Sequence, residues 1–196
     1  HKDYDTDYGP GFDGVDFDLE NFKHYATDDP YCNLWADRLA NLTKALHKDL
    51  PTGTLITHAP QTPYMLSTSG WPSANGSNPN GLYTKMMDKA GEEVSWLNVQ
   101  IYNQGNYSDQ QSLNDMLSAL VTKWPESVNV GPEKVVVTVP FSTREAGTGY
   151  VSPEMLAAGL ESLKGSLPGG LNGWAYDANG SVSPSWDQQF ENLLKN

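Results

Sequence analysis

A short stretch near the start of the chain, Phe12–Glu20, alternates acidic and apolar residues and reads FDGVDFDLE. Successive side chains of a β-strand point to opposite faces, so Asp16, Asp18 and Glu20 would share one face. The other face is apolar and carries Val15, Phe17 and Leu19. Carboxylates on one face repel one another, and packing them together raises the pKa of at least one of them. The stretch therefore predicts a strand that carries chemistry on one side.

Three interpretations of this acidic strand are open. A solvated edge strand suits an antiparallel sheet but fits poorly in a buried parallel one. A cluster of carboxylates could hold Mg²⁺ or Ca²⁺, whereas the four histidines of the chain show no spacing for a zinc site. The interpretation that we favour is carboxyl chemistry at the C-terminal end of a barrel strand, where one acid stays protonated beside its neighbours and donates a proton.

Outward from this strand, strand and helix patterns alternate along the chain. Apolar residues in the segment 29–50 recur with the spacing of one helical stripe, and the β-branched run 134–141 is typical of a strand covered on both faces. We expect Pro125 to stop one helix and Gly169-Gly170 to end another. The expected strands are 12–20, 54–59, 96–102, 134–141 and 171–175, and the expected helices are 29–50, 82–90, 109–124, 153–167 and 186–195.

This strict order of strand and helix predicts an α/β fold with a parallel sheet and right-handed crossovers. The sheet could be open and doubly wound or part of a (β/α)8 barrel. The chain contains neither G-x-G-x-x-G nor G-x-x-x-x-G-K-[ST], which makes the nucleotide-binding versions of the fold less favoured.

Composition narrows the choice of partners. The 196 residues carry a formal net charge of -12, which disfavours nucleic acid and an anionic membrane surface. No apolar run approaches the roughly 20 residues that span a membrane. The 6 Trp and 10 Tyr suit a sugar-binding cleft, because a flat ring stacks on a pyranose, and the single cysteine, Cys32, allows no internal disulfide. We expect no cofactor and no metal ion.

Four N-x-S/T sequons suggest a secreted, glycosylated protein. They begin at Asn41, Asn75, Asn106 and Asn179. Asn41 is the weakest of these acceptors, because it falls within an expected helix.

The acidic stretch Asp13–Glu20 resembles the D-x-x-D-x-D-x-E signature of glycoside hydrolase family 18, the chitinases and endo-β-N-acetylglucosaminidases. Three further segments resemble later strand ends of that family, in the same order: Thr57–Gln61, Val99–Asn103 and Gly173–Asp177. The Q-x-Y-N of the second of these is similar to the plant and fungal-type branch. The resemblance covers nearly the whole chain and implies a (β/α)8 TIM barrel.

The resemblance also implies roles for residues. Glu20 would be the general acid, and Asp18 would accept the acetamide N–H of the substrate. Asp16 would hold and tune Asp18, with a proton shared between them. Tyr102 would donate its hydroxyl to the acetamide oxygen, and Trp174 would stack beneath the distorted sugar.

Other positions have secondary parts. Gln100, Gln61 and Asn103 are expected to contact the sugar or Glu20. Asp13 and Gly14 are expected to be structural within the motif, bracing the entry to the strand.

The implied activity is hydrolysis of β-1,4-linked N-acetylglucosamine by a retaining, substrate-assisted mechanism without a protein nucleophile. A chitinase is the first expectation, and an endo-β-N-acetylglucosaminidase acting on the N-glycan core is the second. A non-catalytic sugar-binding or storage protein on the same scaffold is the third, although such relatives usually lose the acids found here at Asp18 and Glu20.

Chain length conflicts with a whole barrel, which usually needs roughly 250 residues. The signature strand is normally the fourth of eight, so the expected strands correspond to strands four to eight. We therefore expect residues 1–196 to be the C-terminal part of a single catalytic barrel, and a second polypeptide to supply strands one to three.

Overall fold

The computed structural model describes residues 11–20, 30–65, 81–182 and 184–194. Its centre is a sheet of five parallel strands in the order β1-β2-β3-β4-β5, so each strand pairs with the next one along the chain. The strands are β1 (Gly14–Phe17), β2 (Leu55–His58), β3 (Trp96–Gln100), β4 (Val135–Pro140) and β5 (Gly170–Trp174).

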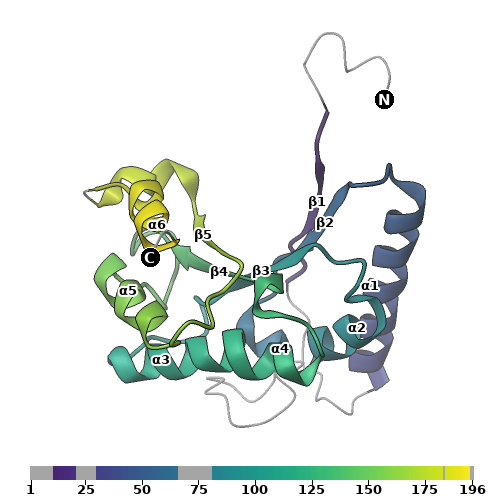
Figure 1. Ribbon diagram of the computed structural model, residues 1–196, viewed down its shortest axis with the longest axis horizontal. Helices are drawn as coiled ribbons and strands as arrows, with labels where there is room; N and C mark the ends of the chain where they lie inside the picture. The colour runs from purple at the N-terminus through teal and green to yellow at the C-terminus, as the bar shows by residue number, and fades with distance from the viewer. Residues whose placement is uncertain (1–10, 21–29, 66–80, 183, 195–196) are drawn as a thin grey trace.

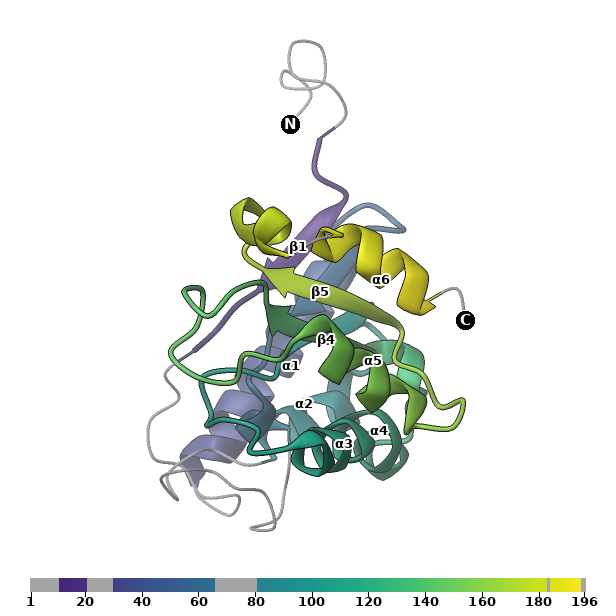
Figure 2. The same cartoon turned by 90° about the vertical axis from the view of Figure 1, so that its left-hand side faces the viewer.

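Helices connect the strands and lie in an arc around one side of the sheet (Figure 1). They run from α1 and α2 beside β1 and β2 to α5 and α6 beside β4 and β5, and Figure 2 shows α3 and α4 below the sheet. The α-helices are α1 (Pro30–Asp49), α2 (Leu82–Ala90), α3 (Gln110–Ser118), α4 (Trp124–Ser127), α5 (Pro153–Glu161) and α6 (Trp186–Leu194). The shorter helical turns are η1 (Thr62–Tyr64), η2 (Ala119–Lys123), η3 (Pro132–Lys134) and η4 (Tyr176–Ser181).

A parallel sheet in sequential order, with helices on its outer side, is the arrangement of a partial (β/α)8 barrel. Every expected strand and helix is present. The hydrophobic core lies between sheet and helices, where the strand residues Leu97, Val99 and Val137 meet the helix residues Leu113 and Leu156. The opposite face of the sheet is polar, and it is the inner face of the barrel.

Two helix ends differ from the sequence prediction. Pro125 does not stop its helix, because the preceding segment η2 widens into a π-helical turn in which the Trp124 N–H bonds to the carbonyl of Ala119. The wider turn makes room for the proline ring, and α4 continues to Ser127. Gly169-Gly170 does not end α5 either.

The helix α5 ends at Glu161, several residues before the expected stop. The chain then turns through Lys164 and Gly165, whose φ angles are 52° and 96°. Left-handed backbone of this kind terminates helices. Gly170 is instead the first residue of β5.

Candidate active site

The strand register places polar side chains side by side on the inner face. Asp16 is the partner of Thr57 across β1 and β2. One step further along, an isolated bridge joins Gln61 to Gln100, and Gln100 pairs with Thr138 on β4. Thr138 in turn pairs with Asn172 on β5. Polar groups from several strands therefore meet near the C-terminal ends of the strands, as barrel active sites require.

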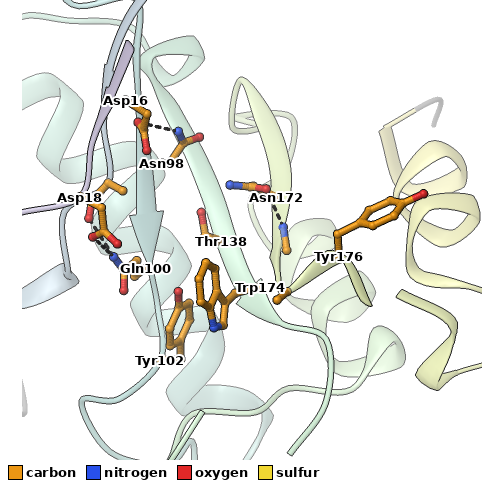
Figure 3. A pocket seen from close by; sticks show the side chains of 12 residues that line it. Asp16, Asp18, Asn98, Gln100, Tyr102, Thr138, Asn172, Trp174 and Tyr176 are labelled. Carbon is orange, nitrogen blue, oxygen red and sulfur yellow. Dashed lines mark hydrogen bonds between the residues drawn. The ribbon is translucent and has the colours of Figure 1, made fainter. Parts of the chain in front are cut away.

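These ends surround a cavity of about 310 Å³ (Figure 3). Its wall contains five of the side chains that the sequence nominated for the site: Asp16, Asp18, Gln100, Tyr102 and Trp174. The rest of the wall consists of Ala59, Asn98, Thr138, Asn172, Gly173, Ala175 and Tyr176.

Gln100 connects the acids at this site. It is almost fully buried, and its Nε2 lies 3.0 Å from Oδ1 of Asp18 and 3.4 Å from Oε1 of Glu20. The same nitrogen donates to the carbonyl oxygen of Ala59 at 2.9 Å. Glu20 does not line the cavity wall, but this shared donor brings it to Asp18.

Electrostatics distinguish Asp18 within the group. Burial raises the pKa of its carboxyl group, and the nearby charges of Glu20 and Asp16 raise it further, while the hydrogen bond from Gln100 opposes the rise. Burial likewise raises the pKa of the Tyr102 hydroxyl, with Asp18 and Glu20 adding to the effect. Tyr102 therefore keeps its proton at neutral pH and remains a hydrogen-bond donor.

Asp16 is held from the sheet rather than by Asp18. Its Oδ1 accepts a hydrogen bond from the Thr57 hydroxyl at 2.5 Å and another from Nδ2 of Asn98 at 3.2 Å. Asn98 and Gln100 thus reach from β3 across β2 to the carboxylates of β1. They can do so because the intervening inner-face residues, Thr57 of β2 and Ala59 just after its end, are small.

Trp174 forms the aromatic surface of the site. Its side chain is 52% exposed, so a ring face is open to a ligand, and the Trp174–Ala175 peptide bond is cis. In Figure 3 the indole lies beside Tyr102, whereas Tyr176 points away from the group.

Two of the nominated substrate-binding residues, Asn103 and Gln61, lie outside the cavity wall. The Asn103 Oδ1 accepts the backbone N–H of Gly147 at 2.8 Å, and the Asn103 backbone is left-handed with a φ of 62°. This side chain holds a neighbouring loop. Gln61 is half-buried and pairs with Gln100 through its backbone.

The motif residues Asp13 and Gly14 lie at the start of β1. The backbone N–H of Leu55 donates to the carbonyl of Asp13 at 2.9 Å. A Cβ atom on Gly14 would approach the carbonyl oxygen of Leu55 to 2.2 Å. Only glycine permits this close pairing of β1 with β2.

Sequence reasoning missed Asn98, Thr138 and Asn172. The signal for two of them was present, because Asn98 stands two residues before Gln100 and Asn172 two before Trp174. Residues two apart on a strand share a face. Thr138 carried no such marker, since it was one polar residue in an apolar run.

Within the described part of the chain, no group of His, Cys, Asp and Glu side chains is arranged to hold a metal ion. None of the helices found there is long and apolar enough to cross a membrane. Among the sequons, Asn41 is exposed on α1, and the Asn106 carboxamide oxygen accepts the Gly149 N–H at 3.0 Å. Asn75 lies outside the described residues.

No family model matches the sequence, but comparison with known proteins finds similar sequences and structures. The chain is 29% identical to Chitinase D of Niallia circulans over 183 residues, which covers 82% of this chain and 34% of that protein. A solved family 18 chitinase of Pseudoalteromonas aurantia superposes with a TM-score of 0.71 at 25% identity, over 92% of this chain and 61% of the other. This chain is similar in sequence and fold to a family 18 chitinase.

Other solved family 18 structures share the fold. Chitinase A of Streptomyces coelicolor, described as putative in its name, gives a TM-score of 0.67 at 25% identity over 94% of this chain and 62% of the other. A fungal endo-β-N-acetylglucosaminidase of family 18 gives 0.59 at 22% identity, and a likeness at that level concerns the fold alone.

The chain spans about a third of the curated Chitinase D and about three fifths of the two solved chitinases. Those solved proteins are longer single chains. The expectation of a separate polypeptide for strands one to three finds no support in the comparisons, and neither does the assignment to the plant and fungal-type branch.

Proposed function

We propose that this chain carries the acid-bearing part of a glycosidase that hydrolyses β-1,4-linked N-acetylglucosamine, and that its substrate is chitin. One observation carries the proposal: Asp18 and Glu20 meet at one buried amide, Gln100, at the rim of a cavity that also presents Tyr102 and Trp174. Residues 1–196 are proposed to form strands four to eight of one catalytic barrel.

The proposed mechanism is retaining and substrate-assisted. Glu20 protonates the glycosidic oxygen while the carbonyl oxygen of the substrate's own 2-acetamido group attacks the anomeric carbon. The bond to the leaving sugar breaks, and an oxazolinium ion forms. Glu20, now a carboxylate, takes a proton from water, and the water oxygen opens the ring with net retention of configuration.

The remaining residues position the acetamido group. Asp18 accepts its N–H, and Tyr102 donates to its oxygen and so orients that oxygen toward the anomeric carbon. The raised pKa of Asp18 has burial as its first cause and the charges of Glu20 and Asp16 as further causes, which is the electrostatic effect expected where three acids lie together. Trp174 offers an apolar face for the sugar ring.

Chitin is preferred to an N-glycan because the matched proteins at 25–29% identity are chitinases by name. The loop that would shape recognition, residues 62–80, lies largely outside the described residues. A non-catalytic sugar-binding protein is the weaker alternative, because the chain keeps both Asp18 and Glu20.

The test uses a chitin hexamer and a high-mannose glycopeptide, with products identified by mass spectrometry. The parent protein should shorten the hexamer and leave the glycopeptide intact. Glu20→Gln should abolish hydrolysis while binding to the hexamer survives. Glu161→Gln, the same change on the exposed surface of α5, is the matched control and should keep full activity.

Either of two results would refute the proposal. Full activity in Glu20→Gln would show that Glu20 is not the general acid. Cleavage of the glycopeptide alone would show that the substrate is the N-glycan core and not chitin. We also propose an extracellular location on the basis of the four sequons. Loss of mass on enzymatic deglycosylation of the natively produced protein would support it, and an unchanged mass would contradict glycosylation.

A further inference from the structure

The two carboxylate oxygens of Asp16 differ in the hydrogen bonds that they accept. Both hydrogen bonds that hold it, from the Thr57 hydroxyl and from the Asn98 amide, end on the same atom, Oδ1. The Thr57 hydroxyl has a single proton, and Oδ1 at 2.5 Å is a far better acceptor than the Val15 carbonyl at 3.4 Å. The second oxygen, Oδ2, is taken up by neither donor.

Trp96 determines which way the Asn98 amide points. The indole nitrogen of Trp96 lies 3.0 Å from the Asn98 side-chain oxygen. An indole N–H can only donate, so the atom that it meets must be the carbonyl oxygen of the amide. The NH₂ group of Asn98 is then the end that faces Asp16. If the amide were reversed, its NH₂ group would face the indole N–H of Trp96, and its carbonyl oxygen would face the carboxylate of Asp16. Both contacts would be repulsive.

Asp16 also lines the cavity, so its orientation matters for the reaction (Figure 3). A carboxylate that accepts two hydrogen bonds on one oxygen is restricted in its rotation. A proton, or a hydrogen bond from the cavity, is then directed to the other oxygen.

We infer that Asn98, oriented by Trp96, is a positioning residue that ties Oδ1 of Asp16 to the sheet and leaves Oδ2 as the oxygen available to Asp18 and the substrate. This inference rests on the proposed hydrolase function. The inference also names the atom of Asp16, Oδ2, through which the proton sharing expected from the sequence would take place. A hydrogen bond between Asp16 and Asp18 would then be made through Oδ2 of Asp16, and the fixed carboxylate needs no reorganisation when the acetamido group arrives.

The kinetic test measures kcat and KM on a chitin hexamer for Asn98→Ala. Loss of a hydrogen bond to a charged group should lower kcat about 10-fold, with KM changed by less than about 3-fold. Trp96→Phe removes the indole donor and leaves a smaller aromatic ring, and because it leaves the Asn98 amide in place it should lower kcat in the same direction by less. Asn114→Ala, the same change on α3 outside the cavity wall, should leave both constants unchanged.

A double-mutant cycle separates positioning from general loss of structure. In an Asp16→Asn background, the further change Asn98→Ala should cost little, because the carboxylate that Asn98 positions is already gone. An undiminished 10-fold loss in that background would overturn the inference, as would normal kcat in Asn98→Ala.

A second readout does not depend on hydrolysis. The side-chain amide signals of Asn98 in a ¹⁵N–¹H NMR spectrum should shift in both Asp16→Asn and Trp96→Phe. Unchanged signals in both variants would overturn the inference even for an active enzyme. Shifted signals in a protein that cleaves no chitin would refute the proposed function while supporting the Trp96–Asn98–Asp16 arrangement.

Discussion

His58 on β2 is a fully buried histidine on the helix side of the sheet. The Thr43 hydroxyl donates to the Leu39 carbonyl at 2.8 Å, so its oxygen is left to accept from the His58 Nε2–H at 3.1 Å. The Nδ1 atom then accepts from the Tyr83 hydroxyl at 3.4 Å. The surroundings therefore require a neutral ring, and burial lowers the pKa of His58 to about 4, although the charge of Asp16 opposes this.

The magnitude follows from linkage between proton binding and folding. In the unfolded chain the histidine has its ordinary pKa of 6.5, and in the folded protein about 4. Between these values the unfolded chain binds a proton that the folded protein does not, so stability falls as pH falls. At about 1.36 kcal/mol per pKa unit, we predict a loss of about 3 kcal/mol from pH 6.5 to pH 4 through His58.

Urea denaturation at steps between pH 6.5 and pH 4 measures this loss. His58→Gln should be less stable at pH 6.5, because it loses ring packing and hydrogen bonds, but its stability should depend less on pH by about 3 kcal/mol. His47→Gln, the same change at an exposed position of α1, should keep the acid sensitivity of the parent. Parallel stability curves for the parent and His58→Gln would refute the reasoning.

Three further substitutions test residues in and around the site. Gly173→Ala should destabilise the protein by about 1–3 kcal/mol in urea denaturation, because a Cβ there would meet the Phe141 ring at 1.9 Å; unchanged stability would contradict this packing. Ala59→Leu should lower kcat about 10-fold or more without unfolding the protein, because the larger side chain separates Gln100 from the acids. Tyr102→Phe removes the hydroxyl that orients the acetamido oxygen, so it should lower kcat roughly 100-fold with an unchanged circular dichroism spectrum. Near-normal turnover would remove Tyr102 from the mechanism.

The alternation of strand and helix was readable because each element buries one face. The helix over 82–90 was predicted with both ends correct, since its apolar positions and flanking glycines agree. The end at Pro125 was not predictable from local rules, because the π-helical turn before it depends on packing of Leu120 and Val121 into the core. A proline in a helix costs free energy wherever it falls, but tertiary packing determines whether the helix ends there or adjusts around it.

The site residues also divide into those that a single strand predicts and those that depend on several strands together. Asp16 and Asp18 were predicted because alternation along a single strand needs no knowledge of neighbouring strands. The contact of Asn98 with Asp16 required knowing that β3 side chains pass over the small residues of β2, which is a property of three strands together. Asn103 was nominated through a motif, yet its carboxamide serves the loop at Gly147.

The close pairing of Gly14 with Leu55 has a consequence for misfolded forms of the chain. Because strand side chains alternate, a slip of β1 by one residue would turn Asp16 and Asp18 toward the helices and Val15 and Phe17 into the cavity. No intermediate alignment presents part of the acid set. Errors in strand pairing should thus yield fully inactive molecules rather than molecules of intermediate activity. The specific activity of a refolded sample would then measure the fraction of molecules whose strands are correctly paired.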